Sequence, residues 1–480
     1  MRVTIAAAAL AFGLAPAGAD PATPQGAKAI EATYAAYFSP AVIDKQIVTV
    51  TPQGDDYLIG WDFEKALAAM GAPADAVAVS PFVYRLTPTL DGGWLARADS
   101  LPNLTVHPLR DGGREGGTAA FDGFRFEGLY DPDAAAPFRA KLRLGSLKID
   151  ARARSGGRLN HFVIAQDGMA SAIQVKAGQR PGEVDIASTQ AVAGSDQQTS
   201  VLGDDGVARG ASDVKQGAAT GDSRIIGLRA ETIGELWRFL VADIGKGAIP
   251  PQQLKPKLEA LAPLWREASG HGEAEAIAIA FPGGAVSIKS TTQQVRVTGL
   301  VEHASATLAF AVNDVNLDLA DAPNWLKQIW PATLALKVEA SVDGLDRATQ
   351  LALDDPEWLK DGALGQDTKM AIREALLAGH PRVSISQTRL ATPLIDATFE
   401  GEAEFGAETQ AHAHVTSDDL DKLLQALAQI APGEPRAQQL IYAATFARGL
   451  ARNEDGRLVW DIAYVAPNAV SVNGQLFSRP

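Results

Sequence analysis

The chain has 480 residues, 46% of them hydrophobic, and 57 acidic side chains outnumber 43 basic ones to give a formal net charge of −14. This balance opposes non-specific binding to nucleic acid or to anionic lipid surfaces, and no run of basic residues predicts a patch that would reverse it. The absence of cysteine excludes a disulfide framework and a lipidated cysteine. Stability must therefore come from apolar burial, and the length suits two or three domains of roughly 100–200 residues each.

Residues 1–19 are typical of a secretory signal peptide. Arg2 supplies a positive charge, an apolar run extends to Leu14, and small residues precede Asp20. No later stretch reaches the length of about 20 apolar residues that a membrane-spanning helix needs. We therefore expect cleavage after Ala19, export to the periplasm and no transmembrane segment.

The first part of the mature chain predicts a leading helix followed by strands. Apolar residues recur at helical spacing over 27–38, and from Lys45 onward the spacing changes to two residues. Short glycine-containing turns separate these segments, which is typical of an antiparallel meander. Residues 178–224 are rich in Gly, Gln, Ser, Asp and Thr and form either long polar strands or a mobile segment; their remaining alternation favours strands.

Helices are predicted next over 232–244, where Thr232 and Glu235 form a capping box, and over 254–265. The C-terminal half alternates strands with short helices, among them 417–430 and 438–450. Together these elements predict an α+β fold that is predominantly antiparallel β, with long meandering strands in extended sheets and short helices packed on them. The predicted domains are 20–250 and 251–480, with a soft boundary whose alternative is one continuous architecture.

The stretch FAVNDVNLDL, residues 310–319, allows two interpretations. Asp314, Asn316 and Asp318 have the spacing that opens a calcium loop, but that loop needs glycine at its sixth position and a carboxylate at its twelfth. These positions hold Leu319 and Trp325. The stretch is therefore predicted to be a strand whose alternation shifts by one residue at Asn313-Asp314, as a β-bulge would produce.

A candidate metal site lies in the segment from Leu394 to Val415. A hairpin there would place Glu402 near His412 and Glu400 near His414 on one polar face. Imidazole and carboxylate groups suit zinc. The alternative is a solvated face with weak His–Glu pairs, which we favour because nothing in the sequence buries or orients the four ligands.

Motifs for other chemistry are absent from the sequence. It contains no nucleophile elbow, no zinc-protease motif, no phosphate-binding loop and no dinucleotide fingerprint. Ser212 and Lys215 match S-x-x-K but lack the companion motifs of that chemistry. No catalytic residue and no cofactor is therefore assigned, and a non-enzymatic role is favoured.

Several segments together resemble one family of exported proteobacterial proteins. They are VTVTPQGDDYLIGWDF, GGWLARADSLPNLTV, FDGFRFEGLYDP, AETIGELWRFLVA and DGRLVWDIAYVAPNAVSVNGQLF. This family is designated a domain of unknown function of the 2125 type, and the resemblance spans nearly the whole mature chain. It implies a location in the cell envelope and no catalytic residues.

Three functions follow from these observations. The first is a periplasmic binding or scaffold protein, with an apolar, lipid-like ligand in a groove between sheet and helices. The second is an assembly or interaction partner in the envelope. The third is a hydrolase that uses the His and carboxylate face of residues 400–414.

Overall fold

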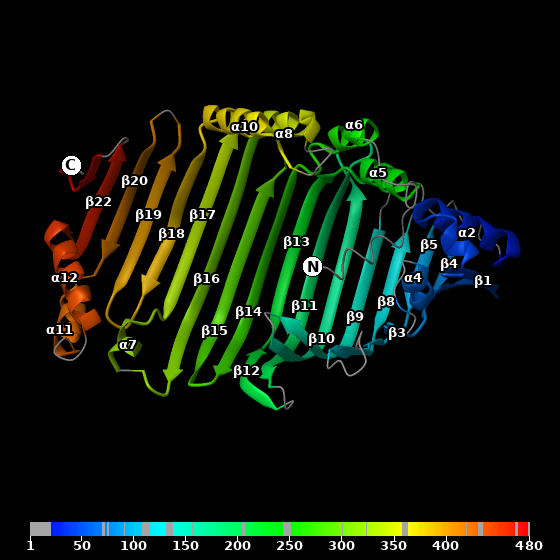
Figure 1. Cartoon of the computed structure of the whole chain (residues 1–480), viewed down its shortest axis with the longest axis horizontal. Coiled ribbons are helices and arrows are strands. Elements are labelled where there is room, and N and C mark those ends of the chain that lie inside the picture. The colour runs from blue at the N-terminus through cyan, green and yellow to red at the C-terminus, as the bar shows by residue number, and fades with distance from the viewer. Residues whose placement is uncertain are drawn as a thin grey trace. The chain divides into compact units, whose positions relative to one another are not determined.

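The computed structural model describes residues 21–69, 73, 76–90, 92–107, 115–130, 138–155, 158–203, 207–242, 251–299, 301–322, 324–357, 363–406, 408–418, 420–430, 435–465 and 469–478. The chain divides into two compact units, of which the first ends at Arg266 and the second begins at Glu267. The predicted signal peptide, 1–19, lies outside the described residues. The fold is predominantly antiparallel β with short helices, as predicted (Figure 1).

The first unit consists of strands that pair antiparallel and of helices near its two ends. Its helices are α2 (Pro24–Phe38), α3 (Ala41–Asp44), α4 (Phe63–Ala69), α5 (Ala230–Ala242) and α6 (Pro251–Leu261). Its strands are β1 (Val48–Gln53), β2 (Asp56–Trp61), β3 (Val77–Val79), β4 (Phe82–Pro88), β5 (Trp94–Ala98), β6 (Leu104–Val106), β7 (Gly116–Asp122), β8 (Arg125–Tyr130), β9 (Phe138–Ser155), β10 (Arg158–Ala177), β11 (Val184–Leu202), β12 (Ala208–Gln216) and β13 (Ala219–Leu228).

The core of the first unit lies between α2 and the sheet. Thr23 caps α2, and its hydroxyl accepts a hydrogen bond from the backbone N–H of Gly26 at 3.0 Å. The buried side of α2 packs on the first strands, where Ile59 is 0% and Val48 is 1% exposed. We call the sheet face under α2 the inner face of the first unit, and a continuous buried cluster closes it.

The second unit alternates strands with short helices. Its strands are β14 (Glu267–Phe281), β15 (Gly284–Thr298), β16 (His303–Leu319), β17 (Thr333–Asp343), β18 (Arg382–Ala391), β19 (Asp396–Glu404), β20 (Gln410–Ser417), β21 (Arg452–Glu454), β22 (Arg457–Val465), β23 (Ala469–Val472) and β24 (Gln475–Ser478). Its helices are α7 (Asn324–Ile329), α8 (Leu345–Asp354), α10 (Gln366–Ala378), α11 (Asp421–Ile430) and α12 (Pro435–Leu450). Neighbouring strands from β14 to β20 pair antiparallel in chain order.

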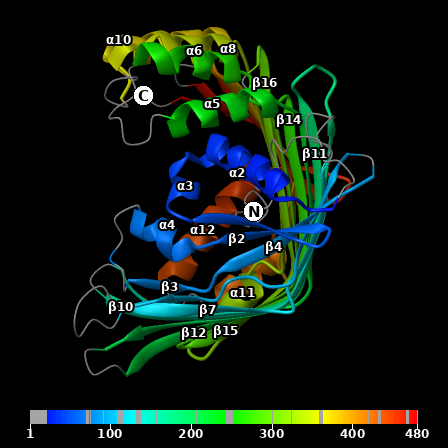
Figure 2. The ribbon, with the colours of Figure 1, turned by 90° about the vertical axis from the view of Figure 1, so that its right-hand side faces the viewer.

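Helices α11 and α12 pack on one face of β20 and β22. Figure 1 labels these four elements, and Figure 2 shows the two helices in the turned view. The buried members of this cluster are Leu420, Leu458 and Trp460, and the indole N–H of Trp460 donates to the carbonyl of Ala447 in α12 at 2.7 Å. This cluster is much smaller than the core of the first unit. The sheet face that carries these two helices is the apolar face of the second unit.

The bulge predicted in FAVNDVNLDL is present. Asp314 adopts φ 53°, and its carboxylate lies 3.1 Å from the ammonium group of Lys289 on β15. On β17, Asn313 pairs with Thr333, but the N–H of Val315 donates to the carbonyl of Ala332 at 2.9 Å, so β16 carries one extra residue against β17. Against β15 the register is the same on both sides of Asp314. The alternation therefore shifts by one residue and returns the following apolar side chains to the same face.

The left-handed backbone at Asp314 predicts a specific pattern of stability. Asp314→Val is expected to lower the free energy of unfolding of the second unit by about 1–2 kcal/mol, because a β-branched side chain is strained at positive φ. Asn316→Val, two residues along the same strand, should change it by less than about 0.5 kcal/mol. Urea titration of both variants measures the difference, and equal losses would contradict the bulge.

Several predicted boundaries are wrong. Helix α5 begins at Ala230, so Thr232 lies inside its first turn, and α6 ends at Leu261. Ser417 ends β20 instead of starting a helix. The compact units separate after α6, between Arg266 and Glu267, and the predicted domain boundary near 250 was a soft one. Residues 178–224 contain strands β11 and β12 and part of β13, which confirms the strand interpretation for the described residues.

Candidate functional site

The polar face predicted for the second unit is assembled by β19 and β20. In the register of this hairpin, Glu400 lies opposite His414 and Glu402 lies opposite His412, as predicted. Strand β22 continues the row, with Asp461 opposite His414. These side chains lie on the sheet face opposite to the one that packs against α11 and α12.

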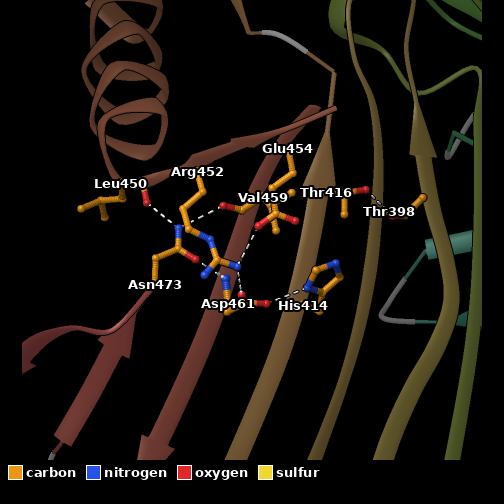
Figure 3. Close-up of polar contacts among 9 residues, drawn as sticks. All are labelled: Thr398, His414, Thr416, Leu450, Arg452, Glu454, Val459, Asp461 and Asn473. Atoms are coloured by element: carbon orange, nitrogen blue, oxygen red, sulfur yellow. Dashed lines mark hydrogen bonds and ion pairs between the residues drawn. The ribbon is translucent and has the colours of Figure 1, made fainter. Parts of the chain in front are cut away.

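The partner of His414 is on β22 and not on β19. Its Nδ1 lies 2.7 Å from Oδ1 of Asp461, and the second carboxylate oxygen of Asp461 pairs with the guanidinium of Arg452 (Figure 3). The hydrogen bond from His414 and the positive charge of Arg452 lower the pKa of Asp461 below its usual value. The sequence does offer one signal for Asp461: it follows Trp460 in a strand that alternates apolar and polar residues, which places its carboxylate on the polar face.

This cluster joins the C-terminal elements to one another. The backbone N–H of Asp461 donates to Oδ1 of Asn473 at 2.8 Å, and the amide nitrogen of Asn473 donates to the carbonyls of Leu450 and Val459 at 2.7 and 3.0 Å (Figure 3). Leu450 is the last residue of α12. The cluster thus ties the end of α12 to β22 and to the turn between β23 and β24.

The described residues of this face show neither a metal-ligand cluster nor a nucleophile hydrogen-bonded to His414. No three His, Asp, Glu or Cys side chains are grouped as a metal site requires, within the residues that the structure describes. A hydrolytic dyad would also need a nucleophile beside His414. The two threonines on this face, Thr398 and Thr416, instead hydrogen-bond each other at 2.7 Å (Figure 3).

The opposite face of the same strands is apolar far beyond α11 and α12. Residues that lie directly opposite one another on neighbouring strands share a face. From Ile462, under the helices, one such row crosses six strand pairs to β15, and its members are Ile462, Ala413, Gly401, Ile385, Val338, Leu308 and Val295. A second row runs parallel to it, with Leu458, Ser417, Ala397, Leu390, Leu334, Val312 and Thr291.

Away from the two helices the middle of this apolar face is open, whereas Ala304 and Leu317 near the two ends of β16 are buried. Val295 is 39%, Leu308 48% and Leu390 37% exposed. The buried clusters formed by the described residues include no side chain of β15, β16, β17 or β18. Polar side chains occupy the other face at the same level, as in the row of Arg296, Thr307, Glu339 and Ser384.

The apolar faces of the two units therefore differ in how far they are covered. In the first unit the inner face is closed by α2 and a large buried cluster, whereas in the second unit several strands keep large aliphatic side chains half-exposed. A broad apolar surface that is left exposed usually marks a site of interaction with another molecule. The apolar face of β15–β18 is thus the best candidate for a functional surface in the second unit.

No helix among the described residues is both long enough and apolar enough to cross a membrane. Comparison with protein-family models, with curated proteins and with solved structures gives no match for the chain.

Proposed function

We propose that the protein is a non-enzymatic binding protein of the periplasm, and that it holds an apolar, acyl-chain-like ligand on the open apolar face of the second unit. The observation that carries this proposal is the row of half-exposed aliphatic side chains that starts beneath α11 and α12 and continues to Val295 and Leu308. The predicted signal peptide and the family resemblance support the location.

An acyl chain suits this surface on physical grounds. Each methylene group that leaves water gains about 0.8 kcal/mol, and a flat row of aliphatic side chains offers no hydrogen-bonding groups that would select a polar ligand. The polar side chains on the opposite face of these strands stay in contact with water when the ligand binds, so the sheet does not need to rearrange. The His and carboxylate cluster then serves to fasten the C-terminal strands.

The test compares two neighbouring positions on β16. Leu308→Asp introduces a charge into the apolar face, whereas Thr307→Asp introduces the same charge on the polar face. We expect Leu308→Asp to weaken binding of a fluorescent long-chain fatty acid by about tenfold or more, because the carboxylate would lose its water against the chain. Thr307→Asp should bind as the unaltered protein does.

Two further measurements distinguish the alternatives. The double variant His412→Ala/His414→Ala should retain ligand binding, and a loss of binding would move the site to the other face. Native mass spectrometry of the purified protein should show co-purifying lipid, with less of it on Leu308→Asp. A protein without bound lipid and with equal affinities in both aspartate variants would contradict the proposal.

A further inference from the structure

A hollow of about 460 Å³ lies on the first unit, on strands β5, β8, β9, β10 and β11. Leu95, Leu129 and Arg139 are consecutive cross-strand partners on one face, and all three line the hollow. Their chain neighbours Trp94 and Tyr130 point to the other side and belong to the buried core. The hollow therefore lies on the outer face, opposite α2.

The floor of this hollow is apolar. Leu129 is 40% exposed, which is unusual for leucine on a polar face, and Leu95, Ala172 and Ala187 continue the apolar lining. The volume falls within the range of about 300–1,000 Å³ that is common for small-molecule sites. An apolar body of modest size would cover these side chains.

Positive charge surrounds the floor. Arg139 and Lys141 line the hollow, and neither has a carboxylate within 4.0 Å in the ranges that the structure describes. The one acidic lining residue, Glu127, lies directly opposite Lys141 in the register of β8 and β9, and its carboxylate forms an ion pair with Nε of Arg97 at 3.2 Å. The two cations at the hollow are thus available to a ligand.

A second pair of like charges lies on the next level of the same face. Arg125 on β8 and Arg143 on β9 are directly opposite each other, and both are exposed. Like charges in this position destabilise a sheet unless an anion lies between or beside them. The acidic chain thus carries a local basic face although its sequence has no run of basic residues. Its sequence signal is the alternation of Arg139, Lys141 and Arg143 along β9.

We infer that this hollow is a binding site for a small anionic amphiphile, a molecule with a phosphate or carboxylate group and a short apolar chain. Arg139 and Lys141 would bind the anionic group, with the bidentate geometry of arginine suited to either oxyanion. Leu95 and Leu129 would bind the chain. The site lies on a different unit from the apolar face of the proposed function, so either can fail alone.

Titration calorimetry with hexyl phosphate and hexanoate tests this site, and the two ligands show which headgroup is preferred. Arg139→Gln/Lys141→Gln should weaken binding by about tenfold or more, and raising salt from about 0.1 to 0.5 M should weaken binding to the unaltered protein. The matched control is Lys148→Gln/Arg152→Gln, which removes the same charge from the same face of β9. It should change affinity by less than about twofold, because these groups lie roughly a Debye length or more from the hollow.

The apolar floor has its own test. Leu129→Gln should weaken hexyl phosphate binding but leave inorganic phosphate, the weaker ligand, unchanged. Equal losses in the two charge-removal variants would show only a general field effect and would overturn the site. Inorganic phosphate binding as tightly as hexyl phosphate, or hexanol binding as tightly as either anion, would show that the ligand need not be amphiphilic.

All variants should keep the circular dichroism spectrum of the unaltered protein. The Leu308→Asp variant, which alters the other unit, should bind hexyl phosphate as the unaltered protein does.

Discussion

Leu86→Ala is expected to lower the free energy of unfolding by about 3 kcal/mol, whereas Leu308→Ala should lower it by less than about 1 kcal/mol in protein freed of ligand. The chemical change is the same, and both leucines lie on strands. Leu86 is 3% exposed within the core beneath α2, so its removal leaves a cavity. Leu308 is 48% exposed, so water already reaches it and fills the space that alanine leaves.

Urea unfolding followed by circular dichroism measures both values, after lipid has been removed by solvent extraction and refolding. Because the chain forms two compact units, the loss caused by Leu86→Ala should appear in one transition and leave the other at its original midpoint. Equal costs for the two substitutions would mean that protein side chains already cover Leu308. The proposed ligand surface would then lose the observation on which it rests.

The strands were predictable because their signal is local. Alternation of apolar and polar residues requires only that one face of a strand be buried, and it was sufficient even in the polar segment that contains β11. The bulge at Asp314 was predictable for the same reason, because a shift in alternation is visible within ten residues. Its backbone conformation confirms the prediction.

Helix ends were less predictable because tertiary contacts determine them. The capping box of Thr232 and Glu235 is a valid local signal, but α5 begins earlier, at Ala230, next to the turn at Gly182, whose carbonyl accepts from the N–H of Glu231. Ser417 resembles a helix cap in sequence, yet it is 3% exposed and pairs with Leu458 at the end of β20. Both outcomes depend on residues distant in the chain.

The candidate sites show the same limit. Glu400 and His414 lie opposite each other in a hairpin, so this pair could be predicted from the local sequence. The hydrogen bond from His414 to Asp461 joins residues 47 positions apart, and no local pattern predicts it. The basic face of the first unit was missed because its cations on β9 alternate with uncharged residues, Arg125 comes from β8, and none of them forms a run in the sequence. Which apolar face is closed and which is open also depends on where the helices pack, and alternation carries no information about that.

A pair of buried tyrosines in the core of the first unit should make this unit less stable at alkaline pH. Tyr34 on α2 is 4% exposed, and its hydroxyl hydrogen-bonds that of Tyr84 on β4, which is also 4% exposed. Burial raises the pKa of Tyr34 to about 12, and the bond from Tyr84 offsets only part of this effect. Burial and the neighbouring Tyr34 also raise the pKa of Tyr84.

The folded state therefore favours the protonated phenols. Their contribution to stability is complete below the unfolded pKa of about 10 and is lost as the pH rises towards the folded value. The rise in the pKa of Tyr34 from 10.0 to about 12 corresponds to a loss of about 3 kcal/mol of stability between pH 10 and 12. Since Tyr84 has a raised pKa as well, the first unit should unfold in this range while its near-neutral stability is unaffected.

The double variant Tyr34→Phe/Tyr84→Phe should remove this alkaline loss and change stability at pH 7 by little, because both partners of the hydrogen bond disappear together. Tyr34→Phe alone leaves the buried hydroxyl of Tyr84 without that partner and should cost about 1–3 kcal/mol at pH 7. Tyr442→Phe, at a position that is 75% exposed, is the control and should unfold with alkali as the unaltered protein does. Thermal unfolding from pH 7 to 12 gives all three comparisons. An alkaline loss that persists in the double variant would show that other groups cause it, since this substitution removes both buried phenols.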